Sequence, residues 1–114
     1  MNRNRRKEIQ MVINDLERIK FRIEGEQYEN LQDDLDSIRS DIETIHDDEQ
    51  DYTDNIPENL QSSDRYYAAE AAVEHLDDAL SYFDDVVEAV EQGEYEDASD
   101  CISDVISELD EASA

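Results

Sequence analysis

The sequence has few residues that break helices or form tight turns. Among 114 residues there are two glycines, one proline and no tryptophan. A β-sheet protein of this length would need a turn signal about every 8–12 residues, so the scarcity favours a few long helices over a sheet. The only proline, Pro57, lies between two long amphipathic patterns. We therefore expect the chain to fold back on itself near Pro57.

Cysteine and long apolar runs are also scarce. Because Cys101 is the only cysteine, no disulfide can form within the chain, which suits a reducing compartment. Its neighbours Asp100 and Asp104 disfavour a thiolate, so we expect no reactive role for this side chain. No apolar run is long enough for a membrane span or for the apolar part of a signal peptide. We expect a cytoplasmic protein without membrane contact.

Basic residues are the third shortage. Nine Lys and Arg oppose 34 Asp and Glu, which gives a formal net charge of -25. Residues 1–22 carry a net charge of +4 and residues 23–114 a net charge of -29. The simplest interpretation is self-neutralisation, in which the basic segment lies across an acidic arm of its own chain or of a second copy. The alternative is a basic arm that touches nucleic acid, although we expect no direct nucleic-acid binding.

Apolar residues recur at intervals of three and four, the period of amphipathic helices. The pattern predicts helices over residues 4–24, 26–56, 64–92 and 95–112, with a turn at residues 55–63. The expected fold class is all-α, either an antiparallel helical hairpin or an elongated three-to-four-helix bundle, in one domain of residues 1–114. Between Ile23 and Tyr28 the apolar face shifts by about 140° on a continuous helix. The helix therefore either breaks near Gly25 or continues with a rotated face.

The second helical pattern repeats every seven residues, like a coiled-coil seam. Glu49 interrupts the seam once. Such a seam needs a partner, and one short C-terminal helix offers little to cover it, so we expect a homodimer. The seam residues are Leu31, Leu35, Ile38, Ile42 and Ile45.

The acidic residues form a candidate binding surface. Residues 26–54 hold 12 acids in 29 positions, about one carboxylate per 3.6 Å of helix axis, and one DNA strand presents a phosphate about every 3.4 Å. Such a surface could occupy the basic groove of a nucleic-acid-binding protein. The plain alternative is a solvated face, although the acid excess is far above what solubility requires. The candidate residues are Asp33, Asp34, Asp36, Asp41, Glu43, Asp47, Asp48, Asp51, Glu74, Asp77, Asp78, Asp84 and Asp85.

Patterns typical of metal sites are incomplete. Residues 47–58 place acids at several positions of a calcium-binding EF-hand loop, but Tyr52 stands where that loop requires glycine. Glu43 and His46 form one Glu-x-x-His pair, whereas a di-iron bundle needs two. We therefore expect no dedicated metal site.

One acidic set has the spacing of a catalytic motif. Glu70, Glu74 and Asp78 lie four residues apart, like the magnesium-binding stack of all-helical nucleotide pyrophosphatases. Those enzymes also need a second acid set and basic phosphate contacts, and the bases here are too few and too N-terminal. No serine, cysteine or lysine has a credible activating partner. We expect no enzymatic activity and no cofactor, and magnesium-dependent pyrophosphatase activity stays the weakest alternative.

Two segments resemble small acidic helical proteins encoded by phages and prophages of Gram-positive bacteria. The resemblance lies in Asn4–Ile9, in Asp54–Tyr66 and in the alanine-rich pattern that starts at Ala68, and it covers residues 3–24 and about 49–92. Its most specific part is the turn of residues 57–62, and residues 26–48 look like an extension that shorter members lack. The resemblance assigns no site residue. It implies a phage context, in which small acidic proteins block host defence or host DNA-binding enzymes and some mimic DNA.

These observations lead to one functional expectation and one alternative. We expect a non-enzymatic phage accessory protein that binds a basic surface of a host protein, a nucleic-acid-binding protein, as a DNA mimic that inhibits a nuclease or a host-defence system. The alternative is a structural or assembly protein whose seams dock partner helices through coiled-coil contacts.

Overall fold

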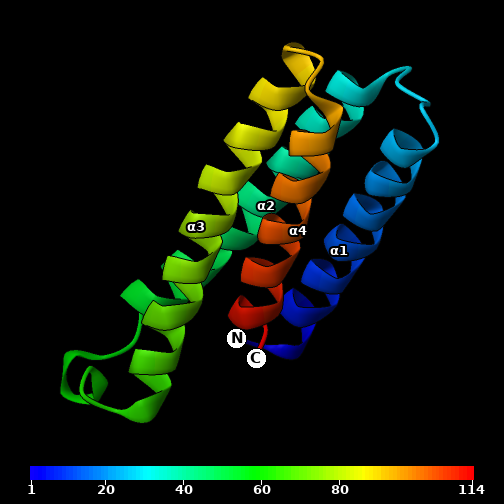
Figure 1. The fold of residues 1–114 in the computed structure, drawn as a ribbon. Coiled ribbons are helices and arrows are strands. Elements are labelled where there is room, and N and C mark those ends of the chain that lie inside the picture. The colour runs from blue at the N-terminus through cyan, green and yellow to red at the C-terminus, as the bar shows by residue number, and fades with distance from the viewer.

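The computed structural model describes residues 1–114 and contains helices and no strands (Figure 1). The α-helices are α1 (Arg3–Glu24), α2 (Leu31–Asp54), α3 (Asp64–Glu91) and α4 (Tyr95–Ala112), and a short 3₁₀ helix (Glu58–Leu60) lies between α2 and α3. The expected all-α class is confirmed, in the form of a helical bundle. None of the helices combines the length and the apolarity that a membrane crossing requires.

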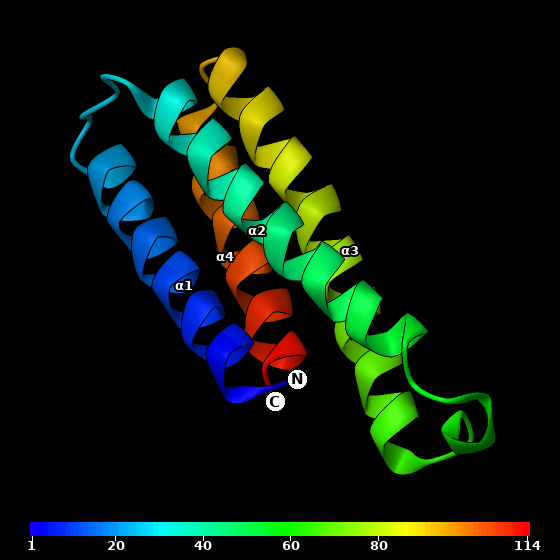
Figure 2. The ribbon, with the colours of Figure 1, turned by 180° about the vertical axis from the view of Figure 1, so that it is seen from behind.

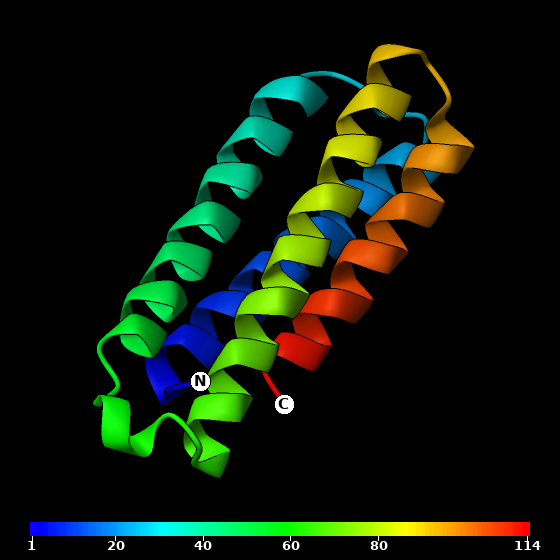
Figure 3. The ribbon, with the colours of Figure 1, turned by 90° about the vertical axis from the view of Figure 1, so that its left-hand side faces the viewer.

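The four α-helices form a closed ring in which neighbours run in opposite directions (Figures 1 and 2). Helix α3 packs against α2 and α4, and α1 packs against the same two helices from the other side. Both chain ends lie at one end of the bundle, and the α2–α3 hairpin extends beyond them (Figure 3). The result is a rod of 52 × 21 × 19 Å.

Side-chain caps and a left-handed glycine mark several helix ends. The Asn2 Oδ1 atom accepts a hydrogen bond from the backbone N–H of Arg5 at 2.8 Å, and Ser63 Oγ accepts one from the backbone N–H of Tyr66 at 3.3 Å. Both residues are typical N-caps. Gly93 follows α3 with φ of 72°, a conformation in which glycine commonly ends a helix. Local sequence therefore fixes where α1 and α3 begin and where α3 ends.

The prediction of a helix over residues 26–56 is wrong at its start, because the helix ends near Gly25 and a loop follows. Helix α1 ends just before this glycine and α2 begins only at Leu31. In between, Glu26 and Asn30 adopt left-handed backbone angles, with φ of 57° and 60°. These residues reverse the chain direction, which settles the choice between a broken and a continuous helix.

The reversal also explains the shift of the apolar face between Ile23 and Tyr28. On a continuous helix the two side chains would point to different partners, whereas the break lets α1 and α2 turn their apolar faces to one core. Ile23 is buried there. Tyr28 lies in the loop instead, where its ring stacks on Tyr95 with centroids 3.7 Å apart. Tyr28 thus joins the loop to the start of α4.

The core is a cluster of 22 buried apolar residues from all four α-helices. Because α3 and α4 complete the ring, the seam of α2 is covered by the helices of its own chain. The uncovered seam from which we expected a homodimer is therefore absent, and the seam gives no argument for a second copy. Each seam residue is at most 5% exposed: Leu31, Leu35, Ile38, Ile42 and Ile45.

The chain turns between α2 and α3 at Pro57, within the predicted segment 55–63. The Pro57 carbonyl accepts a hydrogen bond from the backbone N–H of Leu60 at 2.8 Å, which closes the 3₁₀ turn. Ile56 points inward and is buried, while Leu60 is 44% exposed. Proline suits this position because its ring disfavours helical geometry in the preceding residue. The turn sets α2 and α3 side by side.

Truncation of the seam tests whether one chain is enough to bury it. We expect Ile42→Ala to lower the free energy of unfolding by about 2–5 kcal/mol, because the side chain is fully buried. The urea midpoint should be independent of protein concentration, which a side chain in a dimer interface would not allow. Met11→Ala is the control, since Met11 is 66% exposed and its loss should cost less than about 0.5 kcal/mol. A concentration-dependent midpoint would place Ile42 between two chains.

Candidate functional site

Charge divides the bundle into one basic helix and three acidic ones. Within their bounds, α1 carries a net charge of +3, α2 of -9, α3 of -8 and α4 of -7. We call the exposed carboxylates of α2, α3 and α4 the acidic surface. Because α1 and α3 occupy opposite corners of the ring, this surface is centred on α3 and flanked by α2 and α4, and α1 forms its back.

The structure places all 13 candidate residues at the protein surface on α2 and α3. Asp34 is half-buried and the others are exposed. They do not form a single line, because they point toward three different neighbours. Asp34 lies against α1, Asp84 against α2 and Asp78 against α4. The seven acids of α4 extend the same surface.

The few basic groups lie mainly between neighbouring helices. Arg22 bridges α1 and α2, Arg39 and His46 bridge α2 and α3, and His75 bridges α3 and α4. Arg6 and Lys20 donate from α1 to the C-terminal segment, to a backbone carbonyl and to a serine hydroxyl. A base between two acidic helices replaces repulsion by attraction where the helices are closest. Several bases of the N-terminal segment therefore lie across their own chain.

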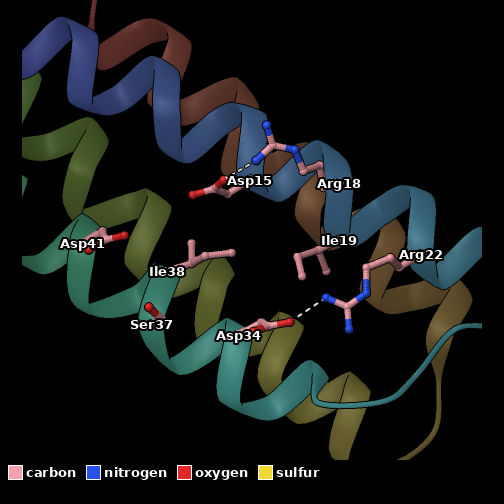
Figure 4. A pocket seen from close by; sticks show the side chains of 8 residues that line it. All are labelled: Asp15, Arg18, Ile19, Arg22, Asp34, Ser37, Ile38 and Asp41. Carbon is pink, nitrogen blue, oxygen red and sulfur yellow. Dashed lines mark hydrogen bonds and ion pairs between the residues drawn. The ribbon is translucent and has the colours of Figure 1, made fainter.

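Figure 4 shows this arrangement in the groove between α1 and α2. Arg18 lies 2.8 Å from Asp15 on the same helix, and Arg22 lies 2.6 Å from Asp34 on α2. Asp41 lines the groove without an ion pair. Both arginines of this groove are thus engaged by acids of their own chain, and Asp41 stays free to meet a cation from outside.

Most of the acid excess has no basic partner within the protein. Of the 34 acidic residues, five form ion pairs with arginine: Asp15, Asp34, Glu43, Glu49 and Asp84. Four more lie beside a histidine: Asp47, Asp77, Glu108 and Glu111. The remaining 25 carboxylates have no ion pair with a side chain of the protein. The acidic surface is therefore not consumed by internal neutralisation.

Glu49 is a charged residue that lies inside the bundle. The sequence pattern did not predict its burial. Its side chain is fully buried, and Arg5 Nε donates to Glu49 Oε2 at 2.6 Å. The arginine also lies over the ring of Tyr52, 5.3 Å from its centroid, and Arg65 covers the same ring at 5.2 Å. Glu49 Oε1 and Arg5 Nη2 are buried without a hydrogen bond, and the Met1 nitrogen lies 3.8 Å from Oε1.

The sequence did contain a signal for this pair. Glu49 follows Ile42 by seven residues and Ile45 by four, so it occupies a seam position and not a gap in the seam. A charged residue at such a position is buried unless the helix ends there, and a buried charge needs a partner of opposite sign. The partner was not visible because Arg5 is 44 residues away and meets Glu49 only when α1 packs on α2.

His75 and Cys101 have raised pKa values. A hydrogen bond to Glu108 raises the pKa of His75 above its ordinary value, and burial partly opposes the shift. Burial, and then the nearby Asp85 and Asp104 carboxylates, raise the pKa of the Cys101 thiol. Cys101 therefore stays protonated at neutral pH, which makes it a weak nucleophile.

Comparison with known proteins finds no match to this chain. No protein-family model, no curated protein and no solved structure matches it.

The buried pair can be tested by removing one charge and then both. We expect Glu49→Gln to lower the free energy of unfolding by about 3–5 kcal/mol, because it leaves the Arg5 charge buried without a partner. The double variant Arg5→Met/Glu49→Leu removes both charges and should recover most of this loss. Glu43→Gln is the control, since its ion pair with Arg39 is exposed and costs less than about 1 kcal/mol to remove. Urea denaturation measures all three, and equal effects of Glu49→Gln and Glu43→Gln would contradict burial.

The raised pKa of His75 predicts a pH-dependent contribution to stability. The imidazolium is favoured in the folded state, so its contribution is complete below the unfolded pKa of about 6.5 and is lost as pH rises through the higher folded pKa. We expect His75→Gln to destabilise the protein more at pH 5.5 than at pH 8.5. The comparison is the difference in urea midpoint between wild type and variant at each pH, which cancels the general effect of protonating carboxylates. An equal difference at both pH values would contradict the shift.

Proposed function

We propose that this protein acts without catalysis, by binding the basic surface of a nucleic-acid-binding protein in place of nucleic acid. Its setting would be the cytoplasm of a bacterial host, where a phage or prophage makes it against a nuclease or a defence system. The exposed carboxylates of the acidic surface would each stand in for a phosphate.

The linear charge density of the bundle is the observation that carries the proposal. A net charge of -25 lies on a rod 52 Å long, which is one net negative charge per about 2.1 Å of axis. Duplex DNA carries one per about 1.7 Å. The length of the rod is about one and a half turns of B-DNA at roughly 34 Å per turn. A groove that accepts a duplex therefore meets similar charge over a similar length.

The carboxylates are also held in place, and most of them lie on the three helices other than α1. They project from helices that share one packed core, so little backbone freedom is lost when a partner binds. The basic helix α1 lies at the back of the acidic surface, opposite α3. A positively charged partner is therefore attracted more strongly to the α3 side than to the α1 side, which orients the complex.

The binding energy would have the same origin as that of nucleic acid. When lysine and arginine side chains of the partner bind carboxylates, counterions are released from both proteins. The affinity therefore falls steeply as the salt concentration rises. Exposed carboxylates without an ion pair, such as Asp33, Asp36 and Glu74, need no internal contact to be broken first. The unpaired carboxylates of α2, α3 and α4 thus form the available interface.

The alternative is an assembly protein that docks partner helices through the seam of α2. In this structure the seam residues are not accessible to a partner. Leu35 and Ile42 are fully buried by the chain's own helices. A partner helix could reach them only after α3 or α4 had left the bundle. No observation favours this second function over the first.

The proposal predicts a salt-sensitive complex that DNA displaces. A protein captured from bacterial lysate at 50 mM salt should dissociate by 200 mM salt, with an affinity lower by orders of magnitude. Duplex DNA should compete with this protein for the captured partner, because both occupy one basic groove. Capture that survives high salt, or that duplex DNA does not disturb, would contradict mimicry.

Matched amide variants locate the interface. The triple variant Asp33→Asn/Asp36→Asn/Glu74→Gln removes three unpaired charges from the acidic surface, and Glu8→Gln/Glu17→Gln/Glu24→Gln removes three exposed charges from α1. We expect only the first to weaken the complex, and the slope of log affinity against log salt to become shallower as engaged carboxylates are removed. Equal weakening by both triples would show that only net charge matters.

A further inference from the structure

The contact between α3 and α4 differs from the other helix contacts, because no lysine or arginine bridges it. The two helices contain 16 acids and a single base, Arg65, which lies at the start of α3. Their only bridge that can carry positive charge is His75. At this contact a cation from solution would therefore take the place of a bridging lysine or arginine.

The side chains around His75 converge on one point. His75 and Asp78 are three residues apart on α3 and so share a face of the helix. Glu108 approaches from α4, with its Oε2 atom 2.8 Å from His75 Nδ1. One ligand atom from each of the three residues lies within 4.8 Å of the other two. Two atoms that each lie about 2.1 Å from an ion are at most about 4.2 Å apart, so little side-chain movement brings all three to an ion.

We propose that His75, Asp78 and Glu108 bind a divalent first-row transition metal ion such as Zn²⁺. The ion would take His75 Nδ1 and one oxygen from each carboxylate, and water would complete its coordination. An imidazole nitrogen among the ligands favours such ions over Mg²⁺ and Ca²⁺, which prefer oxygen. The ion would join α3 to α4 and neutralise charge at their contact, a role separate from recognition of a basic partner.

The second ring nitrogen of His75 supports this assignment independently of the ligand set. Glu111 Oε2 lies 3.4 Å from His75 Nε2, on the opposite side of the ring from Glu108. Metal-binding histidines commonly donate their other N–H to a carboxylate, which fixes the ring orientation and strengthens the bond to the metal. Glu111 is placed for this role because it follows Glu108 by three residues on α4 and therefore shares its face.

His46 provides a natural comparison within the same chain. It also lies between two carboxylates, with Asp47 Oδ1 3.1 Å from Nδ1 and Asp77 Oδ1 2.7 Å from Nε2. These carboxylates flank opposite ring nitrogens, so they cannot bind one ion together with the ring. No third acid converges there with them. A histidine among carboxylates therefore does not by itself produce the convergence of three ligands found at His75.

Calorimetric titration of the untagged full chain with Zn²⁺ at pH 8 tests the proposal. We expect one site per chain, with an affinity at least tenfold lower in His75→Gln and in Glu108→Gln and unchanged in His46→Gln. Millimolar Mg²⁺ should not displace the ion. Wild-type affinity in His75→Gln, equal loss in His46→Gln, or many weak equivalent sites would overturn the proposal, since each indicates diffuse binding to carboxylates. Circular dichroism of each variant verifies that the bundle is intact.

A second measurement needs no variant. In the wild-type chain, stoichiometric Zn²⁺ should shift the imidazole NMR resonances of His75 and leave those of His46 in place. Equal shifts of both rings, or no shift of His75, would overturn the assignment. Because this readout involves no protein partner, its failure would leave the proposed mimicry of nucleic acid untouched, and the loss of that function would leave the metal site untouched.

Discussion

Repulsion between carboxylates is the constraint on which the arrangement of this bundle depends. A net charge of -25 is confined to a rod 52 Å long, and like charges about 4 Å apart repel by about 4 kcal/mol near a protein surface. The apolar core supplies the cohesion, and the scarce bases are placed where helices approach each other. Arg22 and Arg39 both lie at such contacts. The acids that point away from these contacts stay unpaired.

This division of the charges links cohesion to function. Carboxylates at helix contacts are used to hold the bundle together, whereas those facing solvent remain available to a partner. Because α1 is basic, the two sides of the rod differ in charge, which would not be so in a uniformly acidic bundle. The contact between α3 and α4 is the exception, since it has His75 but no lysine or arginine. The proposed metal site there follows the same physical rule, with an ion in the place of a missing base.

The success of sequence reasoning varied with the range of the interaction. Periodicity identified the seam of Leu35 and Ile42, and Pro57 marked the turn, because helix period and proline geometry act within a few residues. The homodimer argument failed because periodicity shows that a face is apolar but not which helix covers it. Glu49 was taken for an interruption for the same reason, since its partner Arg5 is distant in sequence. The acidic candidates lie at the surface, but their division among three helix contacts was not foreseen.

The sequence by itself determined the helical class, the position of the Pro57 turn, and the excess of acid over base. These depend on single residues or on intervals of three and four along one helix. Tertiary structure decided that the chain reverses after Gly25, that α4 closes the ring over the seam, and that His75, Asp78 and Glu108 meet. Each of these depends on which helix lies beside which, and neighbours in a closed bundle are set by packing of the whole core and not by any local pattern.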